Sequence, residues 1–327
     1  MSKKNLYQPK TLLRQKIFLC IFGMLLCFIM LEIVLRMSGF IYYSIYKLPE
    51  DREADYRILC IGESTTFGIG ASNPIVYNYP SQLEKILNEK FPYLRAQCFF
   101  DGSIGINTTE NLFRLPSYIE KYKPHLIIFM VGINNWWNLD KSNILIFTKN
   151  SLASKFFIRL SAFMDRFRVY KLFKWALCST ELIKLNTEID WPDESTGNQA
   201  NTQLRIKMVN QLEEPITHKY NMDIFNEIAY YDLRQMAEIC RERGIKIIIC
   251  SYPGMFDVDS YDRGLYYAQK RVSLLLNCPF VDNYLILSNI ANRAEYFSSD
   301  KWHPNDKGYR LVAENIYNCI LENKLIK

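Results

Sequence analysis

The sequence predicts an α/β protein built on a doubly wound parallel sheet of about five strands, with a flavodoxin-like arrangement. Short, continuously apolar runs alternate with segments of helical periodicity, which is the pattern of a parallel sheet buried on both faces. Three of the five apolar runs are followed directly by a glycine or a proline and a fourth by Asp101-Gly102, as strands are before a turn. The 327 residues are 49% hydrophobic and 23% charged, which is ordinary for a globular protein.

The five predicted strands follow one another at intervals that leave room for helices. They are YRILCI at 56–61, RAQCFF at 95–100, HLIIFMV at 125–131, IKIIICSY at 245–252 and PFVD at 279–282. Helical spacing of apolar residues predicts helices at 80–91, 109–121, 222–243, 259–277 and 306–321. Pro80 begins the first helix, and Gly244 ends the third. Such sheets bind ligands beyond the carboxyl ends of their strands, so the loops after the first three strands and the final loop are the places to examine.

The N-terminal residues predict a membrane anchor. Residues 1–16 carry five basic residues and no acidic one, and residues 17–35 form an apolar run that only Glu32 interrupts. As a helix this run rises by ~28 Å, close to the thickness of a bilayer core. No A-x-A-like cleavage site follows it, and it lacks the polar positions of a buried core helix. We therefore expect a cytoplasmic tail at 1–16, a single transmembrane helix at 17–36 in the cell membrane, and an extracytoplasmic domain.

A linker and an insertion complete the expected organisation. Residues 37–55 are expected to link the span to a domain at 56–327. Residues 136–221 are too long for a plain connection and predict an inserted helical cap. Apolar and aromatic residues recur at helical spacing, with basic residues between them; they are Phe156, Leu160, Phe163, Phe167 and Tyr170. This pattern fits an amphipathic cap with a solvated basic face, or a surface that touches anionic lipid or an anionic polymer.

Charge and cysteine content exclude other classes. The net charge is +6, of which the tail contributes +5, so the remaining chain is almost neutral and does not indicate nucleic-acid binding. Nine cysteines are too few for a disulfide-stapled miniprotein. Cys60, Cys98 and Cys250 lie in apolar runs and are expected to be buried hydrophobes. No cysteine–histidine cluster has zinc spacing, and we expect neither a metal nor a cofactor.

The loop after the first strand carries a candidate nucleophile. It reads GESTTFG at 62–68, which lacks both the lysine of a phosphate-binding loop and the G-x-G-x-x-G of a dinucleotide site. Ser64 lies two residues past a glycine at a strand-to-helix turn, where a hydroxyl is exposed beside backbone N–H groups. Serine is also an ordinary helix N-cap, so this motif does not decide the chemistry alone.

The last loop carries the partners that a nucleophilic serine needs. Residues 300–304 read DKWHP, and in a turn this spacing brings Asp300 close to the His303 imidazole. The other histidines, His125 and His218, have no comparable setting and are expected to serve packing or to face solvent.

Two further loops carry donors for a developing oxyanion. The loop after the second strand, DGSIGINTT at 101–109, supplies two glycines. The loop after the third strand, GINN at 132–135, supplies the side-chain amide of Asn134. Glycine and asparagine are also common turn residues, so each signal is weak when taken singly.

The four segments together, in the order Ser, Gly, Asn and Asp-x-x-His, resemble the SGNH (GDSL-type) hydrolase family from about residue 56 to the end, except in the insertion. The resemblance implies that Ser64 is the nucleophile, His303 the general base and Asp300 the acid of the triad. It also implies that the Ser64 N–H, Gly105 and Asn134 form the oxyanion hole.

Two positions depart from the family pattern. Glu63 stands where the first motif usually has the aspartate of Gly-Asp-Ser, and Asn135 stands where the third usually has the last residue of Gly-x-Asn-Asp. We assign bond-making to neither position, and we expect both to act on the hydrogen bonds that hold the loops.

The predicted function is a serine esterase that removes an O-acetyl or other O-acyl group. An acylated carbohydrate of the cell envelope is the expected substrate, from the anchor and the resemblance. A lipid ester is the next candidate, because the aromatic insertion could cover an acyl chain. An O-acyltransferase would use the same Ser64 and His303 with a sugar hydroxyl in place of water. A membrane-anchored binding module that kept the fold without turnover is a further alternative. An α/β-hydrolase is disfavoured because its turn reads G-x-S-x-G, and Cys250 has no partnered base in the sequence.

Overall fold

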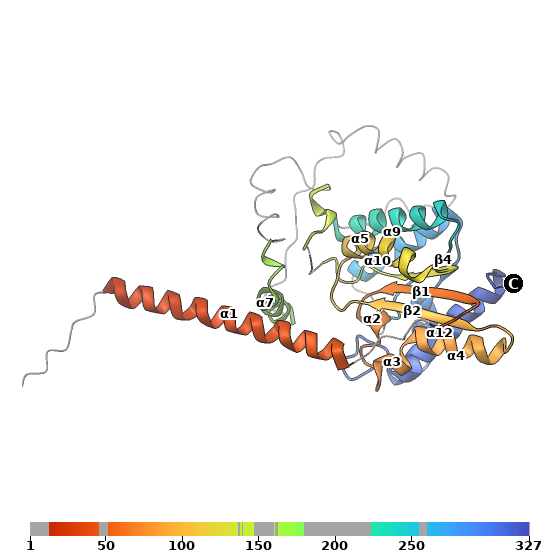
Figure 1. The fold of residues 1–327 in the computed structure, drawn as a ribbon, viewed down its shortest axis with the longest axis horizontal. Coiled ribbons are helices and arrows are strands. Elements are labelled where there is room, and N and C mark those ends of the chain that lie inside the picture. Colours follow the sequence, from red (N-terminus) through yellow and green to blue (C-terminus); the bar gives the residue numbers. More distant parts are fainter. Residues whose placement is uncertain are drawn as a thin grey trace, which may run out of the picture.

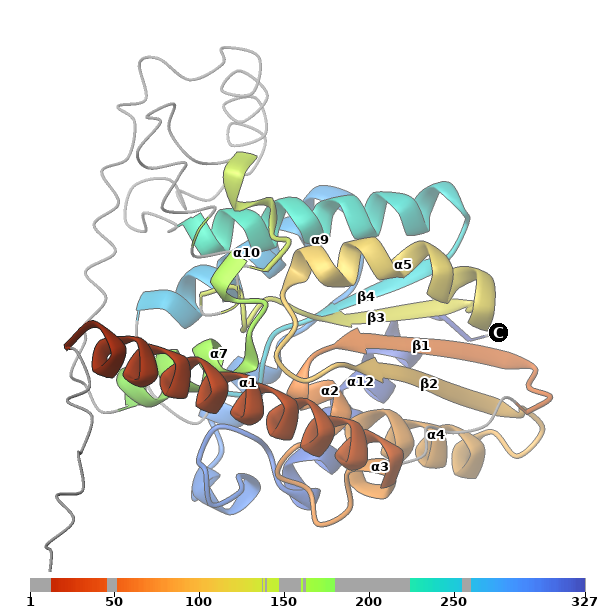
Figure 2. The same ribbon diagram turned by 60° about the vertical axis from the view of Figure 1, so that its left-hand side comes forward.

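A five-stranded parallel sheet forms the centre of the protein, with helices on both faces (Figure 1, Figure 2). The computed structural model describes residues 13–45, 52–136, 138, 140–146, 160, 163–179, 224–254 and 260–326. The strand order is β2-β1-β3-β4-β5, which confirms the flavodoxin-like, doubly wound arrangement.

All five predicted strands are present. They are β1 (Tyr56–Gly62), β2 (Ala96–Gly102), β3 (Leu126–Met130), β4 (Lys246–Cys250) and β5 (Phe280–Val281). The parallel register pairs Gly62 with both Gly102 and Met130, so β1, β2 and β3 end level with one another. The loops that follow these three strands therefore start from one edge of the sheet.

The predicted helices of the domain are confirmed as α4, α5, α9, α10 and α12. The helical elements are α1 (Leu13–Ile45), α2 (Ser64–Phe67), α3 (Pro74–Tyr77), α4 (Tyr79–Lys90), α5 (Thr108–Tyr122), η1 (Asn143–Ile146), α7 (Arg168–Ser179), α9 (Ile224–Glu242), α10 (Ser260–Leu276), α11 (Asn283–Ser288), η2 (Arg293–Tyr296) and α12 (Asp306–Glu322). Sequence analysis missed α2, α3, α11 and the two 3₁₀ turns, because segments of four to six residues are too short to show a periodicity.

Side chains alternate along each strand, so the sheet separates two hydrophobic layers. Cys60 lies in the layer that contains side chains of α4 and α12, whereas Leu59 and Ile61 lie in the layer that contains α5 and α9. Figure 2 shows these helix pairs on opposite sides of the strands. Cys60, Cys98 and Cys250 are buried as predicted, and burial raises the pKa of each thiol, which keeps it protonated and unreactive.

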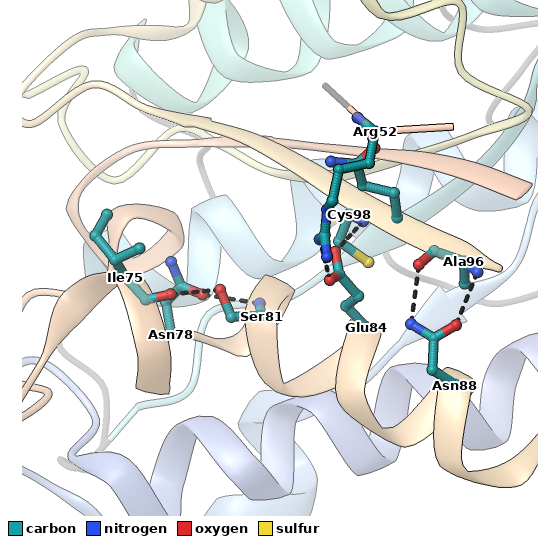
Figure 3. Close-up of polar contacts among 9 residues, drawn as sticks. Arg52, Ile75, Asn78, Ser81, Glu84, Asn88, Ala96 and Cys98 are labelled. Atoms are coloured by element: carbon teal, nitrogen blue, oxygen red, sulfur yellow. Dashed lines mark hydrogen bonds and ion pairs between the residues drawn. The ribbon is translucent and has the colours of Figure 1, made fainter. Parts of the chain in front are cut away.

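Side chains of α4 cover the backbone of the edge strand β2 (Figure 3). Glu84 accepts a hydrogen bond from the Cys98 N–H at 2.8 Å. Asn88 accepts from the Ala96 N–H and donates to the Ala96 carbonyl, both at 2.9 Å. These contacts satisfy backbone groups that an edge strand would otherwise present to another chain.

The N-terminal helix extends further than predicted. It continues past residue 36, the expected end of the span, to Ile45, so the expected linker at 37–55 is helical over 37–45. The extension of the helix has a local cause, since residues 37–45 are largely apolar and contain no proline. Residues 13–41 are long and apolar enough to cross a membrane, a property that spans share with signal sequences.

Only some of the described residues of the insertion are helical. Its described residues include η1, α7 and helical residues at 160 and 163–164, whereas 137, 139, 147–159, 161–162 and 180–221 lie outside the described residues. The expected helical periodicity from Phe156 to Tyr170 is interrupted, because residues 165–166 form a turn and α7 begins only at Arg168. Phe156 itself lies outside the described residues.

A buried carboxylate on α9 holds the start of α5 and η1 in place. Asp232 is fully buried and accepts hydrogen bonds from the hydroxyls of Thr108 and Thr109 and from Asn143 Nδ2, each at 2.6 Å. Burial raises the pKa of Asp232, and the three hydrogen bonds oppose that rise. Three elements that are distant in sequence thus meet at one side chain.

We expect Asp232→Ala to lower the free energy of unfolding by about 3 kcal/mol, because two buried hydroxyls and one partly buried amide lose their acceptor. The measurement is the midpoint of urea unfolding of the full chain in detergent micelles, monitored by near-ultraviolet circular dichroism. Glu238→Ala is the control on the same helix; it removes a partly exposed pair with Arg234 and should cost below about 1 kcal/mol. Equal losses in the two variants would contradict this role of Asp232.

Candidate active site

Three side chains form a continuous hydrogen-bonded array beyond the carboxyl edge of the sheet. Ser64 Oγ lies 2.8 Å from His303 Nε2, and His303 Nδ1 lies 2.6 Å from Asp300 Oδ2. The fold brings the serine and the histidine together across 239 positions of sequence. In such an array Nε2 accepts the hydroxyl proton while Nδ1–H donates to the carboxylate, which is the arrangement that activates a serine.

Ser64 is held at the first turn of α2, directly beyond the end of β1. Backbone bonds from Gly68 and Ile69 to the Ser64 carbonyl, both of 3.0 Å, close this turn. Gly70 then lets the chain pass against the histidine loop: its φ is +93°, and a Cβ there would lie 2.9 Å from that of His303. A larger residue at this position would separate the serine loop from the histidine loop.

The loop that carries His303 is organised around Asp300. Asp300 Oδ1 accepts hydrogen bonds from Ser298 Oγ at 2.6 Å and from the N–H groups of Trp302 at 2.9 Å and His303 at 3.0 Å. Burial raises the pKa of Asp300, but these hydrogen bonds and that of the imidazole lower it further, to about 2. The carboxylate is therefore ionised throughout the neutral range and can orient and stabilise an imidazolium.

The two expected oxyanion donors lie on loops that leave the same edge of the sheet. Asn134 is 8% exposed and follows β3, and Gly105 follows β2. The loops are joined, because Asn138 Nδ2 donates to the Gly105 carbonyl at 2.7 Å and the Asn138 N–H donates to the Asn134 carbonyl at 3.0 Å. Sequence analysis did not single out Asn138; an asparagine in a polar loop carries no distinguishing signal.

This edge of the sheet thus carries serine, histidine and aspartate in hydrogen-bond contact, with glycine and asparagine on the adjoining loops. A profile of the GDSL-like lipase/acylhydrolase family matches residues 60–311. The chain belongs to this family. It is an enzyme that hydrolyses ester bonds, as the resemblance predicted.

Solved structures of similar fold are related to this hydrolase only distantly in sequence. A lipase/acylhydrolase from Enterococcus faecalis is 14% identical, with a TM-score of 0.49, and the match covers 82% of this chain and 96% of that one. An acetyl xylan esterase from Geobacillus stearothermophilus is 15% identical, with a TM-score of 0.48, and the match covers 82% and 95%. No curated protein matches the chain.

Asn135 stands where the family usually has an aspartate, and its side-chain amide both accepts and donates hydrogen bonds. Asn135 Oδ1 accepts from the Thr108 N–H at 2.9 Å, and Nδ2 donates to Thr108 Oγ1 at 2.9 Å and to the Phe225 carbonyl at 3.2 Å. An aspartate would keep the first bond and lose both donations. It would also place a second carboxylate close to Asp232, which already accepts from Thr108.

The glutamate that replaces the other usual aspartate joins three strand ends. Glu63 is fully buried; it accepts the Gly132 N–H at 2.9 Å and contacts the hydroxyl of Tyr252, which also donates to the Met130 carbonyl at 2.9 Å. Burial raises the pKa of Glu63 to about 8, although the bonds from Tyr252 and Gly132 oppose the rise. Tyr252 has one hydroxyl proton, which the Met130 carbonyl accepts, so the contact with Glu63 is a hydrogen bond when a protonated Glu63 donates to the Tyr252 oxygen. The geometry and the raised pKa therefore agree on a neutral Glu63 side chain near pH 7.

The other histidine that the structure describes lies far from this array. His125 Nδ1 accepts the Arg57 N–H at 3.0 Å, and its ring stacks on Tyr56 at 5.3 Å. It serves packing, as expected. His218 lies outside the described residues.

We expect the stability of the wild-type enzyme to fall between about pH 5 and 8. The unfolded chain releases the Glu63 proton near pH 4.5, whereas the folded chain keeps it to about pH 8, so stability decreases with pH across that window. The slope is on the order of 1 kcal/mol per pH unit at most. Glu63→Gln keeps the shape without titrating and should flatten the curve, measured as urea midpoints at several pH values.

Glu238→Gln is the matched control for this experiment, since Glu238 is partly exposed. Its curve should follow that of the wild type. A Glu63→Gln curve as steep as the wild-type curve would show that Glu63 does not hold its proton in the folded state.

Proposed function

We propose that this hydrolase is a serine esterase in which Ser64 is the nucleophile, His303 the general base and Asp300 the residue that orients the imidazole. The observation that carries the proposal is the pair of contacts at 2.8 Å and 2.6 Å that joins these side chains. The ionised state of Asp300 supports it, because a carboxylate there holds the proton of the ring on Nδ1 and leaves Nε2 to accept.

The proposed mechanism follows from these positions. His303 Nε2 takes the proton as Ser64 Oγ attacks the ester carbonyl. The Ser64 and Gly105 N–H groups and the Asn134 amide stabilise the oxyanion that forms, and a well-aligned donor of this kind is worth about 3 kcal/mol. His303 then protonates the departing alcohol. Water attacks the acyl-enzyme with His303 again as base, and the carboxylic acid leaves Ser64.

We further propose that the substrate is an O-acetyl or other O-acyl ester on a carbohydrate of the cell envelope. Support comes from the N-terminal residues. Residues 13–41 are long and apolar enough for a span, and basic residues cluster at and before its start. We propose that the tail lies in the cytoplasm and the catalytic domain outside it, where envelope polymers lie. A lipid ester is the second candidate for the same reason of location.

Ser64→Ala should abolish hydrolysis of a short-chain aryl acetate by the full chain in detergent micelles, because it removes the hydroxyl that contacts His303 Nε2. Loss of the nucleophile in this mechanism costs at least ~10⁴-fold in kcat. The measurement is initial release of the aryl alcohol. Ser117→Ala, on an exposed part of α5, is the control and should keep full activity.

A wild-type chain that is inactive and also fails to react with a fluorophosphonate would overturn the proposed function, because a competent serine reacts even without its natural substrate. Residual wild-type-like activity in Ser64→Ala would overturn the assignment of the nucleophile alone.

Asn134→Ala should lower kcat by ~10²–10³-fold with little change in KM, because an oxyanion donor acts in the transition state and not in the ground state. Asn323→Ala, at the end of α12, is the matched control, since its amide bonds only within its own turn. A change in KM at constant kcat would assign Asn134 to substrate binding instead.

A further inference from the structure

One segment outside the active site leaves several large apolar side chains in solvent. Leu160 is 44% exposed, Phe163 49%, Leu172 43% and Phe173 61%. They belong to the described part of the insertion, at and just before α7, which we call the docking segment (residues 160 and 163–173). Clusters of exposed apolar side chains such as this one mark sites that contact a membrane or another molecule.

The docking segment packs against α1 within the stretch that is long and apolar enough to cross a membrane. The Phe167 ring lies 5.7 Å from that of Phe28, and Arg168 Nη1 donates to the Leu35 carbonyl at 2.9 Å. At 1.5 Å per residue, these partners on α1 span only ~10 Å along its axis. The docking segment therefore lies at the level of the last two turns of the apolar run at 17–35.

The carboxylate that interrupts the apolar run accounts for this contact. Glu32 accepts the Val169 N–H at 3.0 Å, which caps the start of α7 from a different helix, and it pairs with Arg36 at 2.6 Å. Arg36 in turn donates to the Arg166 carbonyl at 3.0 Å. Arg36 thus neutralises the Glu32 carboxylate, which lies where α1 and α7 meet. The hydrogen bond from Val169 to this carboxylate fixes the position of α7 along the axis of α1.

Basic side chains accompany the exposed apolar ones. Arg166 and Arg168 are exposed, and the Arg166 guanidinium lies 5.6 Å from the centre of the Phe163 ring. Apolar side chains with interleaved arginine are the composition of helices that lie in the headgroup region of a bilayer with anionic lipid. This continuity with an apolar helix of spanning length favours lipid as the occupant of the surface.

The docking segment is also connected to the active-site loops. Arg166 Nε lies 3.4 Å from Asp140 Oδ1, and the Asp140 carbonyl accepts from Asn107 Nδ2 at 2.8 Å. Asn107 also donates to the carbonyl of Asn138, the residue that joins the two oxyanion loops. Both views show α2, which begins with Ser64, at the end of the sheet nearer to α1 and α7 (Figure 1, Figure 2).

We infer that the docking segment is a bilayer-contacting surface that lies at the outer boundary between acyl chains and headgroups, beside α1, and holds the active-site edge of the domain toward the membrane. Contact between this surface and the bilayer requires that α1 spans the membrane. The inference also implies that the esterase acts on esters presented at the membrane surface, and this part rests on the proposed function.

A photo-cross-linking experiment tests the surface without using activity. The full chain carries p-benzoylphenylalanine in place of Phe173, Phe22 or Phe113 and is reconstituted in vesicles of phosphatidylcholine and phosphatidylglycerol. Phe22 lies on α1 and is 52% exposed; Phe113 lies on α5 and is 68% exposed. We expect lipid adducts, identified by mass, at positions 22 and 173, with a yield at 173 about fivefold or more above that at 113.

Three results would overturn the inference. Cross-links between two copies of the chain at position 173 would assign the surface to self-association. A yield at 173 no higher than at 113, with adducts at 22, would place the segment away from lipid. Adducts at neither 22 nor 173 would remove the span on which the surface depends.

A second experiment tests the consequence for substrate. The triple variant Leu160→Gln, Leu172→Gln and Phe173→Gln is compared with Leu274→Gln, Leu285→Gln and Phe113→Gln, a control of the same composition at exposed positions elsewhere. Each full chain is assayed in vesicles with a soluble aryl acetate and with a long-chain ester carried in the bilayer. We expect the first variant to lose about tenfold on the bilayer ester and less than about twofold on the aryl acetate, and the control to lose neither.

If the docking-segment variant loses activity equally on both esters, the segment supports the fold of the active site and not its position at the membrane. If this variant keeps full activity on both esters, the segment does not present the active site to the membrane. A wild-type chain that hydrolyses neither ester would count against the proposed function, and the cross-linking result would still decide the surface.

Discussion

The parallel pairing of β1 with strands on both sides is the constraint on which the site depends. Because Gly62 is level with Gly102 and Met130, the nucleophile turn and both oxyanion loops leave the sheet within one layer. The turn is tight: a Cβ on Gly62 would lie 2.0 Å from Thr66 Oγ1 and 2.6 Å from the Met130 carbonyl. The loop of Asp300 and His303 then needs only to reach this edge from the far end of the chain.

The two departures from the family pattern change how the loops are held. An aspartate in place of Glu63 would be one methylene shorter; the glutamate reaches both the Gly132 N–H and the Tyr252 hydroxyl and so links the ends of β1, β3 and β4. Asn135 donates where a carboxylate would repel, and the negative charge nearby resides on Asp232. Buried polar groups with complete hydrogen bonding preorganise a site, and both replacements keep that completeness.

The N-terminal helix and the catalytic domain meet through polar contacts beside an aromatic pair. Glu32 accepts from the Val169 N–H, Arg36 donates to the Arg166 carbonyl, and Arg168 donates to the Leu35 carbonyl. With the packing of Phe28 on Phe167, these contacts define one orientation between the helix and the domain. The orientation matters for function because the same insertion reaches the oxyanion loops through Asp140.

Much of the protein is encoded locally and was determined by the sequence alone. The apolar runs predicted every strand, and the periodicity of 80–91 or 306–321 predicted helices that end within about two residues of their observed limits. The doubly wound sheet directed attention to the loops at one edge, and the resemblance to the hydrolase family implied which residues of those loops form the candidate site. Only the tertiary structure decided the rest: the contact of Ser64 with His303, the partnership of Glu63 with Tyr252, the three donors on Asp232, and the capping of α7 by Glu32. The physical reason is that a periodicity records which face of an element is buried, whereas a hydrogen bond between distant residues depends on where folding brings them.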